Sequence, residues 1–268
     1  MSNTNFKLTK TQDFTIGEPE LTAIFIHGIA ADSSSFNSFF EYLRDKEISG
    51  IRVVAYDLLG VGMSKELGEN YDLDEQMSAL ENSLSDLEIS TPVTIVGHSM
   101  GTMLASRLAA KYLRVGKGQM ITQGTPPEES GMAEQRSVAP DGTILYMVLI
   151  SPPVYTADDI KNPLFKIAID KFCDAVAERD PDFVQSKVFQ NELKTIVENP
   201  ENYDYLAHAN TMTTFIYGKK DQIIASFNYP ELLKKNPLIK TMETDGAHGV
   251  SPEKFDKIVT AIKGDNWR

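Results

Sequence analysis

A serine stands between two glycines in the segment 94–104, which reads TIVGHSMGTML. Gly97 and Gly101 lie two residues either side of Ser99, where a β-branched apolar run gives way to helix-forming residues. A tight turn from a strand into a helix needs unusual backbone angles and neighbours without side chains, so that the two elements can approach closely. Such a turn would hold the Ser99 hydroxyl exposed above a sheet, where it could act as a nucleophile.

For Ser99 to attack a substrate, the fold must bring other groups to it. A serine hydroxyl is a weak nucleophile at neutral pH, so a base must accept its proton and later deliver a proton to the leaving group. A carboxylate that orients this base and preorganised donors that bind the oxyanion complete the chemistry. The elements around Ser99 must therefore gather residues from distant parts of the chain.

Six short apolar segments, rich in Val, Ile, Phe and Tyr and ended by Gly, Asp or Pro, predict buried strands. They read TAIFIHG, IRVVAYD, VTIVGHS, YMVLISPP, TTFIYGKKD and IKTMETDGAH. Helical patterns lie between them; one is expected to start with a capping box of Asp72 and Glu75, another with Ser251 as N-cap and Pro252 at its first position. This alternation predicts an α/β fold with a doubly wound, mainly parallel sheet.

Two connections are too long for simple crossovers between these strands. Residues 151–213 leave the carboxyl end of the YMVLI strand and contain helical patterns. Ligands bind outside the carboxyl ends of strands in open α/β sheets, so this insertion is expected to cover the site as a helical cap. The second connection, 115–142, is expected to be a mobile loop far from the chemistry. We predict a core domain of residues 1–150 and 214–268 and a cap domain of 151–213.

Composition and charge limit the classes of function. The chain has 268 residues, 41% of them hydrophobic, which suffices for a full core. No apolar run approaches the roughly 20 residues of a membrane span, and the polar N-terminal segment shows no secretory signal. We therefore expect a cytoplasmic protein without a membrane span. A net charge of −12 leaves no basic stripe for a phosphate backbone, so no nucleic-acid partner is expected.

The Gly-x-Ser-x-Gly pattern around Ser99 resembles the nucleophile elbow of the α/β-hydrolase family. The likeness covers about residues 21–263. HGIAADSSSF, after the first predicted strand, resembles the oxyanion loop of the family, and DLLGVGMS resembles the loop after the next strand. The long connection 115–142 and a short N-terminal region in place of the family's opening strands depart from the family pattern.

The family places its acid after the nucleophile and its histidine last, which implies roles for two further residues. Asp221 stands just beyond a strand end in FIYGKKDQII, and His248 lies before the final helix in DGAHGVSP. The resemblance therefore implies Ser99 as nucleophile, His248 as base and Asp221 as the carboxylate that orients the imidazole.

Other histidines and the single cysteine are alternatives with different expected roles. His27 and His98 stand in tight turns beside strand ends, which favours structural roles, and His208 lies in a cap helix, where a solvated or core role is expected. Cys173 permits no internal disulfide and is expected to be packed rather than reactive. No His, Asp or Glu cluster shows ligand spacing, so neither a metal site nor a cofactor is expected.

Other acids are alternatives to the carboxylate that the resemblance implies. Asp158 and Asp159 follow the preceding strand and could serve in a variant arrangement. Asp245 is too near His248 in sequence to face it. Asp57 is expected to be a turn residue at a strand end.

By the same resemblance, the backbone N–H groups of Ile29 and Met100 bind the oxyanion, and the Ile29 side chain lines the pocket. The further pocket candidates share uncharged side chains and are Ala30, Val154, Phe165 and Ile169. An unpaired charge in such a pocket is costly, whereas each buried methylene is worth roughly 0.8 kcal/mol. The expected substrates are therefore uncharged.

The serine at the elbow suits acyl transfer, because relatives that cleave carbon–halogen bonds or open epoxides carry aspartate there. The resemblance implies a serine hydrolase that cleaves small to medium, uncharged carboxylic esters, which are small-molecule substrates. Amidases, thioesterases and carbon–carbon bond hydrolases share this triad, and a ligand-binding protein with little turnover is a further alternative. No oligomeric state is predicted.

Overall fold

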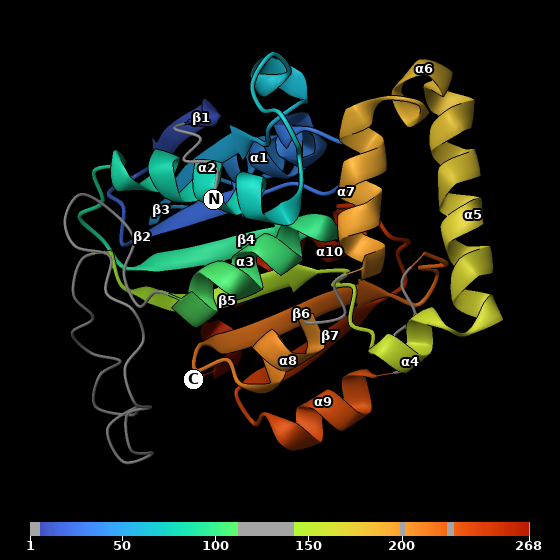
Figure 1. Cartoon of the computed structure of the whole chain (residues 1–268). Coiled ribbons are helices and arrows are strands. Elements are labelled where there is room, and N and C mark those ends of the chain that lie inside the picture. The colour runs from blue at the N-terminus through green and yellow to red at the C-terminus, as the bar shows by residue number, and fades with distance from the viewer. Residues whose placement is uncertain (1–5, 112–141, 199–201, 224–227, 268) are drawn as a thin grey trace.

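A sheet of seven strands forms the centre of the molecule (Figure 1). The computed structural model describes residues 6–111, 142–198, 202–223 and 228–267, so the connection 115–142 lies outside the described residues except at its last position. The strands are β1 (Thr9–Ile16), β2 (Leu21–Ile26), β3 (Ile51–Asp57), β4 (Val93–His98), β5 (Ile144–Ile150), β6 (Met212–Gly218) and β7 (Ile239–Thr244).

The strand order across the sheet is β1-β3-β2-β4-β5-β6-β7. Every neighbouring pair is parallel except β1 and β3, which are antiparallel. The six predicted strands are β2 to β7, which confirms the α/β fold with a doubly wound, mainly parallel sheet. The edge strand β1 is not among the predicted strands, because its sequence TKTQDFTI is mostly polar and none of its residues is fully buried.

Helices cover both faces of the sheet (Figure 1). One face carries α1 (Asn37–Asp45) and α10 (Pro252–Ile262), and the other carries α2 (Leu73–Ser85), α3 (Met100–Lys111), α8 (Asn202–Ala207) and α9 (Tyr229–Lys235). Successive residues of a strand point to opposite faces of the sheet. Phe25 therefore packs in the cluster with α1 and α10, whereas Ile24 and Ile26 pack in the cluster on the other face.

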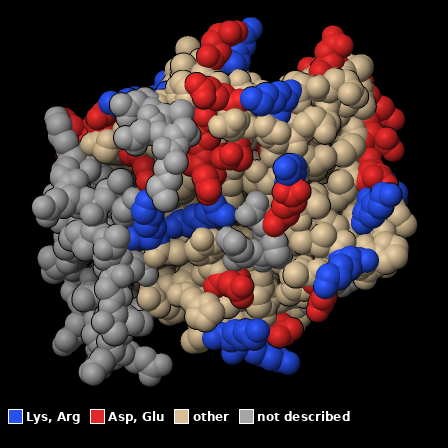
Figure 2. All heavy atoms as spheres, in the orientation of Figure 1, with Lys and Arg blue, Asp and Glu red and all other residues tan. Residues whose placement is uncertain are grey.

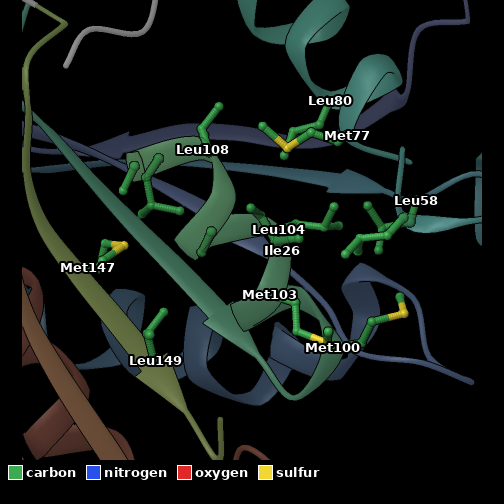
Figure 3. Close-up of a cluster of buried hydrophobic side chains, with 14 of the residues drawn as sticks. Ile26, Leu58, Met77, Leu80, Met100, Met103, Leu104, Leu108, Met147 and Leu149 are labelled. Carbon is green, nitrogen blue, oxygen red and sulfur yellow. The ribbon is translucent and has the colours of Figure 1, made fainter. Parts of the chain in front are cut away.

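The cluster on the α2 and α3 face fixes the helix that begins at the predicted elbow. Leu104 and Leu108 of α3 lie in this cluster with Ile26 of β2 and with Met77 and Leu80 of α2 (Figure 3). All five side chains are buried. Burying such side chains is worth roughly 1.5–3 kcal/mol each, so α3 is held firmly against the sheet.

The two predicted helix starts lie where they were expected, with different hydrogen bonds. The Asp72 side chain caps α2 by accepting a hydrogen bond from the Glu75 N–H at 2.9 Å. The Glu75 carboxylate does not complete a capping box; it instead accepts hydrogen bonds from the N–H groups of Asn70 and Tyr71 in the preceding turn. Ser251 is the N-cap residue of α10, but its side chain makes no capping hydrogen bond.

Between β5 and β6 the chain forms a group of helices that we call the helical insertion. These are α4 (Ala157–Ile160), α5 (Pro163–Arg179), α6 (Pro181–Val184) and α7 (Lys187–Glu198). They pack against one another in chain order and stand beside the carboxyl ends of β4 and β5, at the right of Figure 1. The next helix, α8, contacts α3 and α9 and so belongs to the layer on the sheet.

The two ends of the helical insertion are joined to each other. Asn202, at the start of α8, donates a hydrogen bond from Nδ2 to the Pro153 carbonyl at 2.8 Å. Asn202 and Pro153 are both buried. The helical insertion therefore leaves and rejoins the rest of the chain at one place.

Charges of both signs share the face of the molecule that Figure 2 shows. Figure 2 shows acidic and basic side chains interspersed over the face that carries α2, α3, α8 and α9, with uncharged surface between them. Among the described helices, none combines the length and the apolar character needed to cross a membrane.

Candidate active site

Ser99 occupies the turn between β4 and α3 in a left-handed backbone conformation, with φ of 50°. Its N–H donates to the Ile150 carbonyl and its carbonyl accepts from the Thr102 N–H, both at 2.9 Å. This conformation is unfavourable for a residue with a side chain and persists only where the surroundings hold it. Local strain of this kind is found at functional sites, which is consistent with a nucleophile elbow.

The glycines on either side of Ser99 are required by close backbone contacts. A Cβ added to Gly97 would lie 2.7 Å from the Gly101 carbonyl oxygen, and one added to Gly101 would lie 2.2 Å from the Ile26 carbonyl oxygen. Both distances are too short for any side chain. The strand, the turn and the helix can therefore pack together only with glycine at these two positions.

Asp221 and His248 meet at the same edge of the sheet. Asp221 follows β6 and His248 follows β7, and carboxyl ends of neighbouring parallel strands lie together. His248 Nδ1 lies 2.9 Å from Asp221 Oδ2, with 15% of the histidine side chain and 4% of the aspartate side chain exposed. This hydrogen bond favours the tautomer with the proton on Nδ1, which leaves Nε2 able to accept a proton.

His98 links the elbow to the loop that carries His248. Its ring centroid lies 5.0 Å from that of His248, and its Nε2 donates to the His248 carbonyl at 3.1 Å. Burial lowers the pKa of His98 to about 3, so its imidazole is neutral. Within the described residues no hydrogen bond joins Ser99 Oγ to His248. Such contacts often tighten only when substrate is bound.

The residues expected to bind an oxyanion flank Ser99. Met100 is the first residue of α3, so its N–H has no acceptor within the helix, and the positive end of the helix dipole lies there. Ile29 follows Gly28, and a Cβ on Gly28 would lie only 2.9 Å from the Ser99 Cβ. The loop with Ile29 therefore lies directly against the serine.

A cavity of about 130 Å³ adjoins Ser99 and is lined mainly by apolar side chains. Four of the predicted pocket residues line it, namely Ile29, Val154, Phe165 and Ile169. The helical insertion supplies further apolar residues, Leu164 and Phe172 of α5 and Leu193 and Ile196 of α7. Polar side chains reach the cavity at Asp159, Asn162 and Asn228.

Ala30 differs from its prediction as a pocket residue. The chain turns at Ala30, with φ of 55°, and the residue lines a neighbouring groove of about 550 Å³ instead of the cavity beside Ser99. Arg179 of α5 donates a hydrogen bond to the Ala30 carbonyl, and the Glu192 carboxyl of α7 lies at the Ala30 N–H. Ala30 is thus a contact between the helical insertion and the loop that contains Ile29.

The Glu192 carboxyl is fully buried in this contact. The nearest side-chain donor is Gln76 Nε2, which lies 3.4 Å from Oε1. Oε2 has no hydrogen-bond partner among the residues that the structure describes. Burial raises the pKa of Glu192 to about 8, and the Ala30 N–H opposes the rise.

The alternative acids lie away from His248 or have other partners. Asp158 is exposed and pairs with Lys161 at 3.0 Å, and Asp245 is exposed and pairs with Lys219 at 3.1 Å. The Asp159 carboxylate accepts hydrogen bonds from the N–H and hydroxyl of Thr156, and so caps α4. None of these three carboxylates contacts an imidazole in the described part of the chain.

Asp57 and His27 have structural partners. Asp57 is buried and accepts hydrogen bonds from the N–H groups of Ser33 at 2.8 Å and Met63 at 2.7 Å. His27 is buried and accepts at Nε2 from the Leu58 N–H at 2.9 Å. Both residues therefore hold the loops that follow β2 and β3.

The remaining candidates do not assemble into a second site. His208 is exposed just after α8, and Cys173 is half-buried in α5, where burial raises the pKa of its thiol. Across the ranges that the structure describes, no group of three or more His, Cys, Asp or Glu residues is placed to hold a metal ion.

Two buried charged residues near the site were not among the sequence candidates. Lys254 lies fully buried in the first turn of α10, and Glu192 is buried in α7. Each shares a helix face with apolar residues three or four positions along, Ile258 for Lys254 and Ile196 for Glu192. A charge in phase with an apolar stripe is the signal that could have found them.

Comparison with known proteins places the chain in a family. The model of the alpha/beta hydrolase family matches residues 23–246. A protein named probable lysophospholipase BODYGUARD 4 from Arabidopsis thaliana is 30% identical over 123 residues, which are 45% of this chain and 28% of that protein. A proline iminopeptidase from Saccharolobus solfataricus is 26% identical over 132 residues, which are 48% of this chain and 42% of that protein. The matches thus span less than half of these relatives.

A solved structure supports the same fold along almost the whole chain. A thermophilic esterase from Thermogutta terrifontis superimposes with a TM-score of 0.62 and 16% identity, covering 97% of this chain and 93% of that chain. At this identity the likeness supports the fold alone. The family model, in contrast, extends from β2 to the turn after β7 and includes the elbow at Ser99. The chain therefore belongs to the alpha/beta hydrolase family.

Proposed function

We propose that this chain is a serine hydrolase that cleaves small to medium, uncharged carboxylic esters through an acyl-enzyme on Ser99. One arrangement carries the proposal. Ser99 lies in a left-handed turn beside an apolar cavity, and the hydrogen-bonded pair of Asp221 and His248 lies at the same edge of the sheet.

In this mechanism Ser99 Oγ attacks the ester carbonyl carbon while His248 Nε2 takes the serine proton. Asp221, already bonded to Nδ1, stabilises the imidazolium that forms. The N–H groups of Ile29 and Met100 bind the oxyanion, an interaction worth about 3 kcal/mol for each donor. His248 then gives its proton to the alkoxy group as the carbon–oxygen bond breaks, and the alcohol leaves.

The second half of the reaction restores the serine. A water molecule attacks the acyl carbon while His248 Nε2 accepts its proton. The oxyanion occupies the same two N–H groups as before. When this intermediate collapses, His248 returns a proton to Ser99 Oγ and the carboxylic acid leaves.

The cavity supports the proposed substrate class. Its volume of about 130 Å³ is close to that of engineered apolar cavities that hold benzene, so it suits a short to medium acyl chain. An anionic acyl group would lose its hydration against Ile29, Val154 and Phe165, and the described lining contains no Lys or Arg to pair with it. In this proposal the core domain, residues 1–150 and 214–268, carries the chemistry, and residues 151–213 act as a cap.

The names of the relatives are consistent with bond hydrolysis and differ in the bond. A lysophospholipase cleaves an ester, whereas an iminopeptidase cleaves an amide. We favour the ester because the lining beside Ser99 is mainly apolar, and the Asp159 carboxylate in it already accepts hydrogen bonds from Thr156 and Asn228. Cleavage of amides at comparable rates is the alternative that the test below distinguishes.

The test is labelling with a fluorophosphonate, followed by rates on matched nitrophenyl esters and anilides. Ser99→Ala should abolish both labelling and hydrolysis, because the attacking oxygen is gone. Ser106→Ala, which removes another buried hydroxyl from α3, should retain both. Substantial hydrolysis by Ser99→Ala would contradict the proposal. Wild-type protein that is neither labelled nor active would indicate a ligand-binding protein, and equal rates on the anilide would indicate an amidase.

A further inference from the structure

The backbone of His248 is held by an unusual number of donors. Its carbonyl oxygen accepts hydrogen bonds from His98 Nε2 at 3.1 Å, Ser151 Oγ at 3.0 Å and Lys254 Nζ at 3.1 Å. A carbonyl oxygen has two lone pairs, and here three donors converge on it, one more than its lone pairs. The three side chains come from β4, the residue after β5 and α10, which are distant in the sequence.

Lys254 makes further contacts with the same turn. Its Nζ donates to the Ala247 carbonyl at 2.5 Å and to the Gly249 carbonyl at 2.6 Å, in addition to that of His248. An ammonium group has three N–H donors, and here they meet three consecutive carbonyl groups. All the hydrogen bonds of this ammonium group therefore go to the turn that carries His248.

This arrangement places a charge where helices seldom carry one. Lys254 is fully buried, and an ammonium group is costly to bury unless its donors are satisfied. Burial lowers the pKa of Lys254 to about 8, while the charges of Asp221 and Glu253 oppose that change. The position lies on the buried face of α10 beside Phe255, where an apolar side chain would fill the same space without this cost.

We propose that Lys254 is a positioning residue: its ammonium group fixes the 247–249 turn so that the His248 imidazole is held between Asp221 and Ser99. The inference rests on the proposed function, in which His248 is the base. Lys254 acts through the backbone of His248 and does not touch substrate. Its loss should therefore slow the chemical step and leave substrate binding unchanged, because the cavity lining contains no residue of this turn.

The main variant is Lys254→Met, which keeps an unbranched side chain and removes the donors. Lys257→Met, one turn later on α10 and half-buried, is the matched control. We expect Lys254→Met to lower kcat about tenfold or more, with KM within about twofold of wild type. The rate constant of fluorophosphonate labelling should fall in parallel, while the final stoichiometry per folded protein stays the same. Lys257→Met should match wild type.

A second variant covers the case in which Lys254→Met does not fold. Lys254→Gln keeps a donor that ends one bond short of the ammonium position and so cannot reach all three carbonyls. It should show the same fall in kcat at unchanged KM, with near-UV circular dichroism reporting the fold. Either folded variant with kcat within about twofold of wild type would overturn the inference. Equal losses in labelling stoichiometry and kcat would also overturn it, because they indicate unfolding alone.

Failure of the proposed function gives a different result. If wild-type protein is neither labelled nor active on esters, amides or thioesters, the assignment of Ser99 and His248 fails, and the role of Lys254 fails with it. Suppose instead that wild-type protein is labelled at Ser99 and turns over, and that the Lys254 variants have the same kcat as wild type. The proposed function then stands, and the inference about Lys254 alone fails.

Discussion

The two walls of the cavity beside Ser99 are held to different degrees. On the side of the sheet, Ile29 and Val154 are buried, with 8% and 2% of their surfaces exposed. On the side of the helical insertion, Leu164 of α5 lines the same cavity while 67% exposed. Among the 17 residues of α5, Val176 alone is buried. The residues proposed to react thus lie on a packed framework. On the insertion side, α5 is sparsely packed, whereas Ile196 of α7 is buried.

This difference follows from what each wall has to do. In the proposed mechanism, attack by Ser99 depends on its separation from His248, and a displacement of about 1 Å can cost on the order of a hundredfold in rate. Apolar contacts with an acyl chain are non-directional and tolerate small displacements. Changes on the sheet side should therefore alter turnover, and changes on the insertion side should alter which substrates are accepted.

The largest expected effect lies on the sheet side, at Asp221. Asp221→Asn should lower kcat by about 10⁴-fold, because the amide favours the wrong imidazole tautomer and Nε2 no longer accepts the serine proton. Steady-state kinetics on a short nitrophenyl ester measures this. Asp158→Asn, which removes an exposed carboxylate in the helical insertion, should match wild type. A normal Asp221→Asn with an inactive Asp158→Asn would show that the acid is misassigned.

An intermediate effect is expected where the two walls meet, at Glu192. Burial raises its pKa in the folded state to about 8, above the ordinary value. Between about pH 4.5 and pH 8 the folded protein holds a proton on Glu192 that the unfolded chain has released. The free energy of unfolding therefore falls as the pH rises through this range. Glu192→Gln replaces this carboxyl with an amide that does not titrate. As the pH rises from 5 to 8, the free energy of unfolding of wild type should fall relative to that of the variant by on the order of 3 kcal/mol.

Urea unfolding of wild type and Glu192→Gln at several pH values measures this difference. Glu178→Gln, an exposed carboxyl in α5, is the matched control and should show no such trend. A constant difference between Glu192→Gln and wild type across this range would mean that Glu192 is ionised in the folded protein.

The smallest expected effect concerns substrate choice on the insertion side. Phe165→Ala should enlarge the cavity and raise kcat/KM for octanoate relative to butyrate esters by about tenfold, which corresponds to burial of about two of the added methylenes at roughly 0.8 kcal/mol each. Its kcat on acetate should stay near wild type. Ile167→Ala, on the same helix and outside the cavity lining, is the control. A fall in kcat on acetate as large as the change in selectivity would remove the distinction between the two walls.

The sequence predicted the sheet better than the contacts around the site. Parallel strands buried on both faces read as continuous apolar runs, which identifies β2 to β7, whereas the polar edge strand β1 carries no such signal. The predicted end of the cap domain at residue 213 does not coincide with the end of the helical insertion. Strand β6 already begins at Met212, and α8, which lies within the predicted range, packs on α3. These contacts depend on tertiary packing and leave no periodic pattern.

For the candidate site, the resemblance to the α/β-hydrolase family implied Ser99, Asp221 and His248 through the order of the motifs. The same resemblance implied the N–H groups of Ile29 and Met100. The direction in which Ala30 faces depends on its positive φ, and an alanine in the sequence does not indicate a positive φ. The role of Lys254 depends on three carbonyl groups, and backbone acceptors are the same in every sequence.

The hydrogen bond between Asn202 and Pro153 has a consequence for how such a molecule can change over generations. The helical insertion leaves and rejoins the rest of the chain at one place, where this hydrogen bond joins its two ends. Lengthening or replacing the helices of the insertion therefore displaces no strand and moves neither Asp221 nor His248. Selection can therefore replace the helical insertion as a unit. The same sheet then accepts different ligands while the positions of Asp221 and His248 stay unchanged.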